Sequence, residues 1–272
     1  MFSLNLKGRL VKFHRPAIMA IINATDDSFY SGARNGGIAE IEVALSEGAD
    51  IIDIGACSTR PGAAQVSLEQ EWERLSAALK AVRAIDDTAV VSVDTYRAEI
   101  ARRALSEGAD IINDISGGML DEDMDTVVAS AGAPYVVMHM RGTPETMQQL
   151  TDYTAEGGVT ASVIKFLAER VAQLQSKGVN DVIIDPGFGF AKTVAQNYEL
   201  LKNLPLIGAA LKCPMLVGVS RKSMFYKPLG LTPNDVLPAT CAANMMALQG
   251  GAAILRVHDV GAARQVMEVY NS

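Results

Sequence analysis

A chain of 272 residues with 49% hydrophobic and 6% aromatic side chains is long enough to bury one large aliphatic core. Its net charge is −7 and its basic residues are scattered, which excludes a general nucleic-acid surface. The opening segment is too polar for a secretion signal, and no stretch approaches the roughly 18 apolar residues of a membrane span. We therefore expect neither nucleic acid nor a membrane as a partner.

Three cysteines, Cys57, Cys213 and Cys241, lie far apart and form no zinc-type cluster. This dispersed, odd set is typical of a reduced protein, so we expect a cytoplasmic location. Cys57 has no histidine near it in sequence, and no GxGxxG or Walker-type loop is present. These absences disfavour thiol, nicotinamide and nucleotide-hydrolysis chemistry.

Short apolar runs recur along the whole chain and are predicted to be β-strands. The eight runs lie at 17–22, 50–54, 89–93, 110–114, 135–139, 181–185, 214–219 and 252–257. Helical stretches follow them, for example at 68–85 and 163–178. Eight successive β/α units favour closure over an open doubly wound sheet, because none of the runs resembles an edge strand. We predict an α/β fold with one domain over 1–272: a single (β/α)8 TIM barrel over 17–272 with a short N-terminal capping segment, 1–16, at its other mouth.

An internal repeat supports this organisation. The stretch LSEGADIIDI at 45–54 recurs as LSEGADIINDI at 105–115. In each copy a helical stretch stops at a glycine suited to a C-terminal cap, Gly48 or Gly108, and the chain then enters an apolar run. A helix followed by a short buried strand is typical of α/β proteins with a parallel sheet.

Polar residues close the apolar runs, and barrel enzymes place their catalytic groups at these C-terminal strand ends. They are Asn23, Thr59, Arg60, Asp94, Asn113, Asp114, His139, Asp185, Ser220, Lys222, Ser223, Arg256 and His258. Asp94 has two open interpretations, a site carboxylate or a cap of the following helix. We predict that Asp121 and Asn234 are helix caps and that His139 is a hydrogen-bonded core group. An active site is expected at this end of the barrel.

Two groups of side chains indicate what such a site would bind. Arg256 and His258 are two residues apart on one run, so they face the same side and offer a guanidinium fork and an imidazole to one anion. Phe188 and Phe190 lie in the Gly-rich stretch DPGFGF, where they are predicted walls for a flat aromatic ligand. Met138 is interpreted first as a core residue.

Seven short motifs occur at seven strand ends: IINATDDSF, DIGACSTRPGA, SVDTY, NDISGG, DPGFGFAKT, GVSRKS and LRVHDV. In these motifs the chain resembles dihydropteroate synthase, from about Met19 to Asp259. The resemblance implies a transferase of folate biosynthesis that joins 6-hydroxymethyl-7,8-dihydropterin diphosphate to p-aminobenzoate and releases pyrophosphate. It also implies Mg2+ as cofactor and sulfonamides as inhibitors, and we expect a homodimer.

The resemblance also implies a role for each matching position. The pterin would contact Asp94, Asn113, Asp185, Lys222, Phe190 and Met138. The p-aminobenzoate would contact Thr59, Arg60, Pro61, Ser223 and Phe29. The diphosphate would contact Asn23, Arg60, Arg256 and His258, with Asn23 beside the Mg2+. The catalytic residues would be Asp94, Lys222, Arg256 and His258, which stabilise the departing pyrophosphate and the pterin methylene cation.

The sequence departs from the family pattern at Asp26, where proline is usual, at Cys57, where glutamate is usual, and at Ala191, where glycine is usual. Two other functions remain open. One is a pterin-binding methyltransferase, which should lack the STRPG segment and the Lys222–Ser223 pair. The other is a non-catalytic pterin-binding protein, which would have no use for a diphosphate site.

Overall fold

The computed structural model describes residues 1–24, 36–57 and 66–272. In this part of the chain the main sheet consists of β3 (Ala17–Asn23), β4 (Ile51–Gly55), β5 (Val90–Asp94), β6 (Ile111–Asp114), β7 (Tyr135–Met138), β8 (Val182–Asp185), β9 (Leu216–Val217) and β10 (Ile254–Val257). Neighbouring strands are parallel, in the order β8-β7-β6-β5-β4-β3-β10-β9. A bridge between Ile184 and Met215 connects the two ends of this order. The sheet nearly closes on itself, which confirms the predicted barrel.

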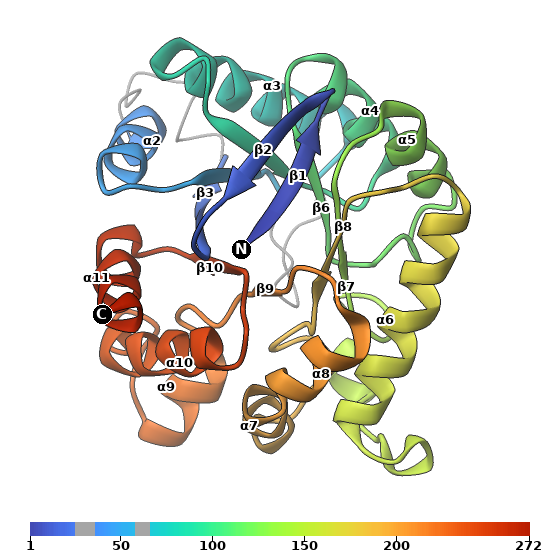
Figure 1. Ribbon diagram of the computed structural model, residues 1–272, viewed down its shortest axis with the longest axis vertical. Coiled ribbons are helices and arrows are strands. Elements are labelled where there is room, and N and C mark those ends of the chain that lie inside the picture. The colour runs from blue at the N-terminus through green and yellow to red at the C-terminus, as the bar shows by residue number, and fades with distance from the viewer. Residues whose placement is uncertain (25–35, 58–65) are drawn as a thin grey trace.

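Helices surround the sheet as an outer ring (Figure 1). In the described residues they are α2 (Gly36–Ser46), α3 (Leu68–Ile85), α4 (Ala98–Ser106), α5 (Met124–Ala131), α6 (Val159–Ser176), α7 (Val194–Lys202), α8 (Leu204–Leu211), α9 (Ser223–Leu229), α10 (Leu237–Gln249) and α11 (Val260–Asn271), with short 3-10 turns at Met147–Gln149 and Thr154–Glu156. Helix α3 coincides with the predicted 68–85. Helix α6 begins four residues before the predicted 163–178 and ends at Ser176, with Gly158 as its N-cap.

The two copies of the internal repeat adopt the same local structure. Gly48 and Gly108 have φ angles of 90° and 113°, a region that favours glycine, so both glycines terminate their helices as predicted. The aspartates that follow, Asp50 and Asp110, each accept a backbone N–H of the neighbouring strand at 2.9 Å. The shared sequence therefore specifies both the end of a helix and the attachment of the next strand.

The two predicted helix caps were wrong in detail. Asp121 accepts the backbone N–H of Ala98 at 2.8 Å, so it satisfies the start of the preceding helix, α4. The residue at the cap position of α5 is Asp123. Asn234 instead accepts a hydrogen bond from the Arg221 guanidinium at 3.0 Å. In both cases a tertiary partner uses a side-chain oxygen that the local pattern assigned to the next helix, although the other Asp121 oxygen still accepts the Asp123 backbone N–H at 3.1 Å.

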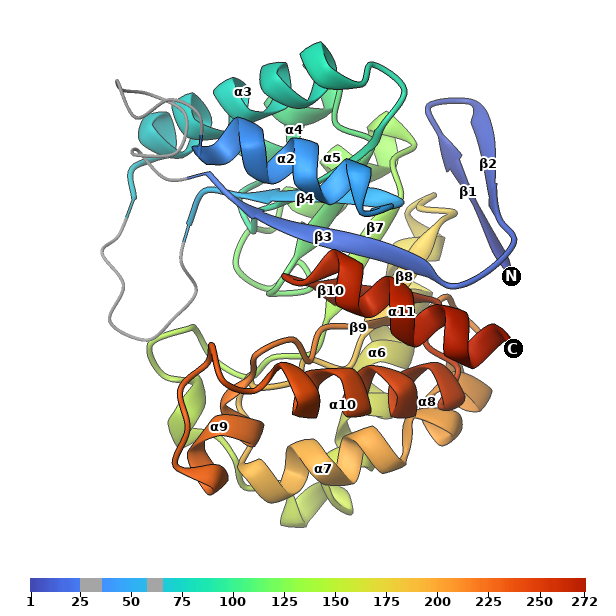
Figure 2. The same cartoon turned by 90° about the vertical axis from the view of Figure 1, so that its left-hand side faces the viewer.

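An N-terminal hairpin lies across one end of the barrel (Figure 2). Its strands, β1 (Phe2–Leu6) and β2 (Arg9–Phe13), pair antiparallel. Leu4 and Leu6 pack into a buried cluster with residues from the strand beginnings, including Ile51. The hairpin covers the N-terminal mouth, which leaves the mouth at the C-terminal strand ends for a ligand.

The interior of the barrel changes from apolar to polar along β4 and β5. On β4 the side chains of alternate residues share one face, so Asp53 and Gly55 follow Ile51 toward the C-terminal mouth. The register partners of Asp53 and Gly55 on β5 are Ser92 and Asp94. The layer above the apolar cluster is therefore polar, and it forms the floor of the C-terminal mouth.

Candidate active site

The C-terminal ends of neighbouring strands bring predicted site residues together. Asp94 on β5 and Asn113 on β6 are register partners, and so are Met138 on β7 and Asp185 on β8. Gly55 is the partner of Asp94 on its other side, and a Cβ there would lie only 3.4 Å from the Asp94 Cβ. The glycine leaves space for the carboxylate of Asp94.

Arg256 on β10 reaches across the mouth to two carboxylates. Its Nε donates to Asp53 Oδ2 at 2.6 Å, and its Nη2 donates to Asp94 Oδ2 at 2.7 Å. Burial raises the pKa of Asp94 against the opposing attraction of Arg256, and the charges of Asp53 and Asp114 act in the same direction as burial. The N-cap position of α4 is Arg97, so Asp94 is not the helix cap, and the interpretation as a site carboxylate remains.

Asp53 is the first residue of the motif DIGACSTRPGA, but the sequence analysis assigned it no role in the site. Its side chain is fully buried, and its Oδ2 accepts from Asn113 Nδ2 at 3.1 Å as well as from Arg256. The available signal was a charged residue inside an otherwise apolar strand, IIDIG. A buried charge is costly unless it is paired, so its presence in a core strand indicates a functional partner.

Asp185 ends β8 with only 7% of its surface exposed. Its Oδ1 accepts the backbone N–H of Gly187 at 2.7 Å. Burial raises the pKa of Asp185, whereas that hydrogen bond and the nearby charges of Lys222 and Arg256 oppose the shift. The following helix, α7, is capped by Thr193, so Asp185 does not serve as its cap.

Lys192, which lies in the motif DPGFGFAKT but was assigned no role there, is buried beneath the Gly-rich loop. Its Nζ donates to the carbonyl oxygens of Gly187 and Phe190, both at 2.9 Å, and lies 3.0 Å from Nδ1 of His139. His139 is 2% exposed, and burial together with the Lys192 charge lowers its pKa to about 2. His139 is a hydrogen-bonded core group, as predicted. Ala191 has a φ of 50°, which explains why glycine is the usual residue there.

Replacing Lys192 by methionine should destabilise the protein by on the order of 3 kcal/mol, because the Gly187, Phe190 and His139 carbonyls would lose a buried donor. The urea midpoint of unfolding measures the loss. Lys80→Met, at an exposed position of α3, is the matched control and should change the midpoint little. Equal midpoints for the two variants would show that the loop does not depend on Lys192.

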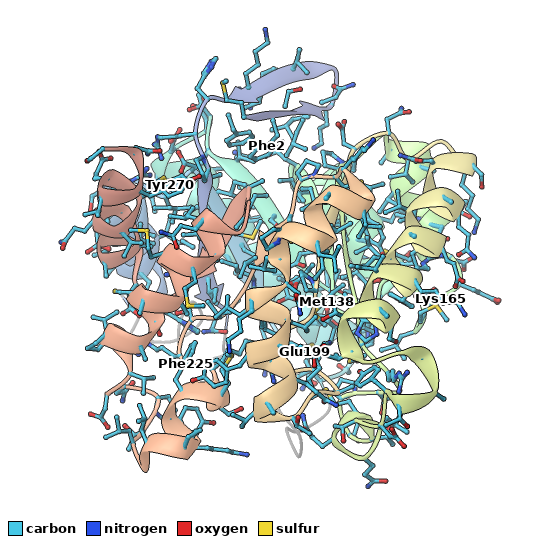
Figure 3. All side chains as sticks on the ribbon, turned by 60° about the horizontal axis from the view of Figure 1, so that its bottom comes forward. Phe2, Met138, Lys165, Glu199, Phe225 and Tyr270 are labelled. Atoms are coloured by element: carbon cyan, nitrogen blue, oxygen red, sulfur yellow. The ribbon has the colours of Figure 1, made fainter. Side chains whose placement is uncertain are left out.

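Phe190 and Met138 form an apolar wall beside the charged groups. Phe190 packs on a small buried cluster that contains Met138, and Lys222 Nζ lies 4.7 Å from the centre of the Phe190 ring. Met138 lies near the middle of the molecule, well inside the outer helices that carry Lys165 and Glu199 (Figure 3). Phe188, in contrast, is 1% exposed within the main core, so the prediction that it lines the ligand site was wrong.

His258 follows β10 and is oriented by Ser220. The Ser220 Oγ accepts the His258 backbone N–H at 3.2 Å and lies 3.0 Å from its Nδ1. In the tautomer in which the Ser220 hydroxyl donates to Nδ1, the neutral ring carries its proton on Nε2. Loss of water around the ring and the charges of Arg256 and Arg221 lower the pKa of His258 to about 4. In that tautomer a neutral His258 supplies a hydrogen-bond donor, and Arg256 supplies the charge.

The basic segment after β9 serves two different purposes. Arg221 donates to both oxygens of Asp259, at 2.9 Å and 2.5 Å, so its charge is used for structure. Lys222 sits at the N-cap of α9 and extends over Phe190. Ser223 is the first residue of α9. The site therefore receives Lys222 and Ser223 from this segment.

Four predicted p-aminobenzoate residues, Phe29, Thr59, Arg60 and Pro61, lie outside the described residues, as does Asp26. Cys57 is described, and burial together with the charge of Glu71 raises the pKa of its thiol to about 12. This position therefore holds an un-ionised thiol where the family usually has a carboxylate.

The predicted magnesium position is at the end of β3. Asn23 is exposed there, next in register to Gly55. Among the described residues no three His, Cys, Asp or Glu side chains gather as a cage for a metal ion. Mg2+ is usually held by one or two protein groups together with substrate phosphates and water, and the Asn23 amide oxygen fits that arrangement.

A barrel with buried carboxylates, an arginine, a lysine and a neutral histidine at one mouth has the groups that an enzyme would need to bind a polar ring attached to an anion. A family model described as pterin binding enzyme matches residues 19–258. Dihydropteroate synthase from Synechocystis is 43% identical over 94% of this chain and 89% of its own length. The chain belongs to the pterin binding enzymes and, among them, to the dihydropteroate synthase family.

Solved structures support the same assignment. A Yersinia pestis dihydropteroate synthase with a bound sulfonamide drug superposes with a TM-score of 0.90 at 34% identity, covering 99% of this chain and 98% of the other. The Burkholderia cenocepacia enzyme complexed with 7,8-dihydropteroate gives a TM-score of 0.87 at 38% identity, covering 99% and 95%. Fold and sequence therefore agree over nearly the whole chain.

Proposed function

We propose that this chain is a transferase that condenses 6-hydroxymethyl-7,8-dihydropterin diphosphate with p-aminobenzoate to give 7,8-dihydropteroate and pyrophosphate. The observation that carries the proposal is the arrangement of Asp94, Asn113 and Asp185 around one mouth with Arg256 between two carboxylates. One side of the mouth suits a hydrogen-bonding ring, and the other suits its diphosphate.

The pterin half of the substrate is assigned to the acidic side. A pterin edge carries several N–H donors, and Asp185 retains one oxygen that Gly187 does not use. Lys222 can donate to the ring carbonyl, and the same lysine lies over Phe190. Phe190 and Met138 then provide an apolar surface for the flat ring.

The diphosphate half is assigned to Arg256, His258 and Asn23. Arg256 can offer its guanidinium to phosphate oxygens, and neutral His258 can donate from Nε2. Mg2+, held by Asn23 and the substrate, would offset the charge of the departing pyrophosphate.

The reaction follows from these contacts. The bond between the pterin methylene carbon and the diphosphate oxygen breaks, and the electron pair leaves with pyrophosphate. The buried carboxylate of Asp94 stabilises the positive charge that develops on the methylene. The aniline nitrogen of p-aminobenzoate then forms the new C–N bond and releases a proton. Ser223 is assigned to the carboxylate end of p-aminobenzoate, with the four residues outside the described part of the chain.

The two other candidate functions are less well supported. A pterin-binding methyltransferase should lack the Lys222–Ser223 pair, which is present here at the start of α9. A non-catalytic pterin binder would not need Arg256 and His258 at the mouth. Calorimetry distinguishes these cases: the pterin diphosphate should bind more tightly than 6-hydroxymethyl-7,8-dihydropterin, and equal affinities would contradict a diphosphate site.

Sulfonamides are expected to compete with p-aminobenzoate. Both molecules present an aniline opposite a polar acceptor, and a sulfonamide is bound in the Yersinia pestis relative. Initial rates at several p-aminobenzoate concentrations should give a raised KM and an unchanged maximal rate. Inhibition that p-aminobenzoate cannot overcome would place the drug elsewhere.

The assembly and location of the protein belong to the same proposal. We expect a homodimer, and the exposed side chains of Leu206 on α8 and Leu229 on α9 are candidate contacts. A cytoplasmic location is consistent with Cys57, Cys213 and Cys241, all of which are free thiols. None of the described helices is long and apolar enough to cross a membrane.

A further inference from the structure

Arg256 shares one of its two carboxylate partners with the substrate. The proposed function assigns Asp94 to the pterin, yet Asp94 Oδ2 accepts from Arg256 Nη2 at 2.7 Å. When Asp94 turns to the pterin, this guanidinium nitrogen loses its partner. The same nitrogen then becomes a donor for the diphosphate.

Asp53 is the partner that a substrate does not reach. It is fully buried, one layer below Asp94, and its Oδ2 receives Arg256 Nε at 2.6 Å. The same oxygen accepts a hydrogen bond from Asn113 Nδ2 at 3.1 Å. Asp53 is therefore hydrogen-bonded both to Asn113, which is assigned to the pterin, and to Arg256, which is assigned to the diphosphate. A charge-assisted hydrogen bond of this kind holds a guanidinium at a defined angle.

We propose that Asp53 is a positioning residue. It keeps its hydrogen bond to Arg256 Nε while Asp94 exchanges its hydrogen bond with Arg256 for one with the pterin. When the pterin binds, the acceptor of the hydrogen bond from Arg256 Nη2 thereby changes from Asp94 to the diphosphate. The proposal rests on the proposed function, because it takes Asp94 as a pterin ligand. It assigns Asp53 no contact with the substrate.

The energetic reason is the charge that remains on Arg256. Without Asp53, the Arg256 guanidinium would have no fixed anion beside it once Asp94 binds the pterin. It would then reorient toward an exposed carboxylate or toward water, and diphosphate binding would have to restore its orientation. Asp53 supplies that anion from a position sealed from solvent. Its fixed hydrogen bond keeps the donor in place before the diphosphate arrives.

The test compares Asp53→Asn, Arg256→Gln and the double variant. The readout is the ratio of affinities for the pterin diphosphate and for 6-hydroxymethyl-7,8-dihydropterin, together with kcat. Asp53→Asn should lower this ratio and kcat by about 10-fold or more, since an amide is a weaker acceptor for a cation. In the Arg256→Gln background the same substitution should change both by less than about threefold, because coupled residues do not act additively.

Ser92→Ala is the matched control. Ser92 is the register partner of Asp53 and is equally buried, but its hydroxyl forms a hydrogen bond with neither Arg256 nor Asn113. This variant should leave the affinity ratio and kcat within about twofold of the parent. An equal loss in Ser92→Ala, or an unchanged Asp53 effect in the Arg256→Gln background, would overturn the proposal and assign Asp53 to the general stability of the barrel.

A measurement on the unaltered protein covers the case in which Asp53→Asn does not fold. In the NMR spectrum of the 15N-arginine-labelled chain, the Arg256 Nε–H should exchange slowly with water both before and after pterin is added. Rapid exchange once pterin is bound would contradict the proposal. If pterin diphosphate binds but no dihydropteroate forms, the proposed function fails, while the affinity ratios and the exchange rate still test Asp53.

Discussion

Asp185→Asn is expected to weaken pterin binding by roughly 10- to 100-fold. This factor corresponds to the loss of hydrogen bonds to a charged group, which costs about 1.5–3 kcal/mol. Gly187 already donates to Oδ1, so the pterin must use the other oxygen. An amide nitrogen there would present two N–H donors to the N–H donors of the pterin edge. The fold should survive, because neutralising a buried carboxylate removes a desolvation cost.

Calorimetric titration with pterin measures this effect, and the same strand offers a matched control. Asp181 precedes β8 at the opposite mouth, where its Oδ2 accepts the backbone N–H of Asn5 at 3.1 Å. Asp181→Asn makes the same chemical change away from the site and should leave pterin affinity unaltered. If Asp185→Asn binds pterin as tightly as Asp181→Asn does, Asp185 is not a pterin ligand.

Arg256→Ala should lower kcat by roughly 100- to 1,000-fold, as does the loss of one oriented donor to a developing anion in other enzymes. Pterin affinity should fall less, because the charge of Arg256 matters most when pyrophosphate leaves. The variant also leaves Asp53 buried without its cation, which should cost about 3–5 kcal/mol of folding stability. Rates must therefore be measured at a temperature at which the variant is folded.

Arg83→Ala separates the two effects of the Arg256 substitution. Arg83 pairs with Asp110 at 3.0 Å, at the beginning of a strand and away from the proposed active site. This control should lose stability while its kcat stays close to that of the parent. A kcat loss of similar size in both variants, or an Arg256 effect confined to KM, would count against a role for Arg256 in pyrophosphate departure.

Much of the fold could be predicted because local signals agree with the global topology. Gly48 and Gly108 end their helices where the repeat placed them, and each predicted strand overlaps an observed one. The predicted strand 214–219 is longer than the observed one: β9 covers only Leu216–Val217, and Met215 adds an isolated bridge to Ile184. Apolar content alone does not reveal where hydrogen bonding to a neighbour stops.

The strand-end rule located residues, but it could not show their partners. Asp94 and Arg256 were both predicted site residues, yet nothing in the sequence showed that they bond to each other. Asp53 was missed because it lies inside a strand, and Lys192 because its partners are carbonyl oxygens, which every residue carries. Phe188 and Phe190 both adjoin Gly189, and tertiary packing places the first in the core.

The most direct measurement is product formation by the purified chain. With 6-hydroxymethyl-7,8-dihydropterin diphosphate, p-aminobenzoate and Mg2+, the protein should form 7,8-dihydropteroate and pyrophosphate in equal amounts, with no dihydropteroate when p-aminobenzoate is omitted. Mass spectrometry of the pterin product and an enzymatic assay of pyrophosphate determine the ratio. Tight binding of both substrates without either product, or pyrophosphate release without dihydropteroate, would contradict the proposed reaction.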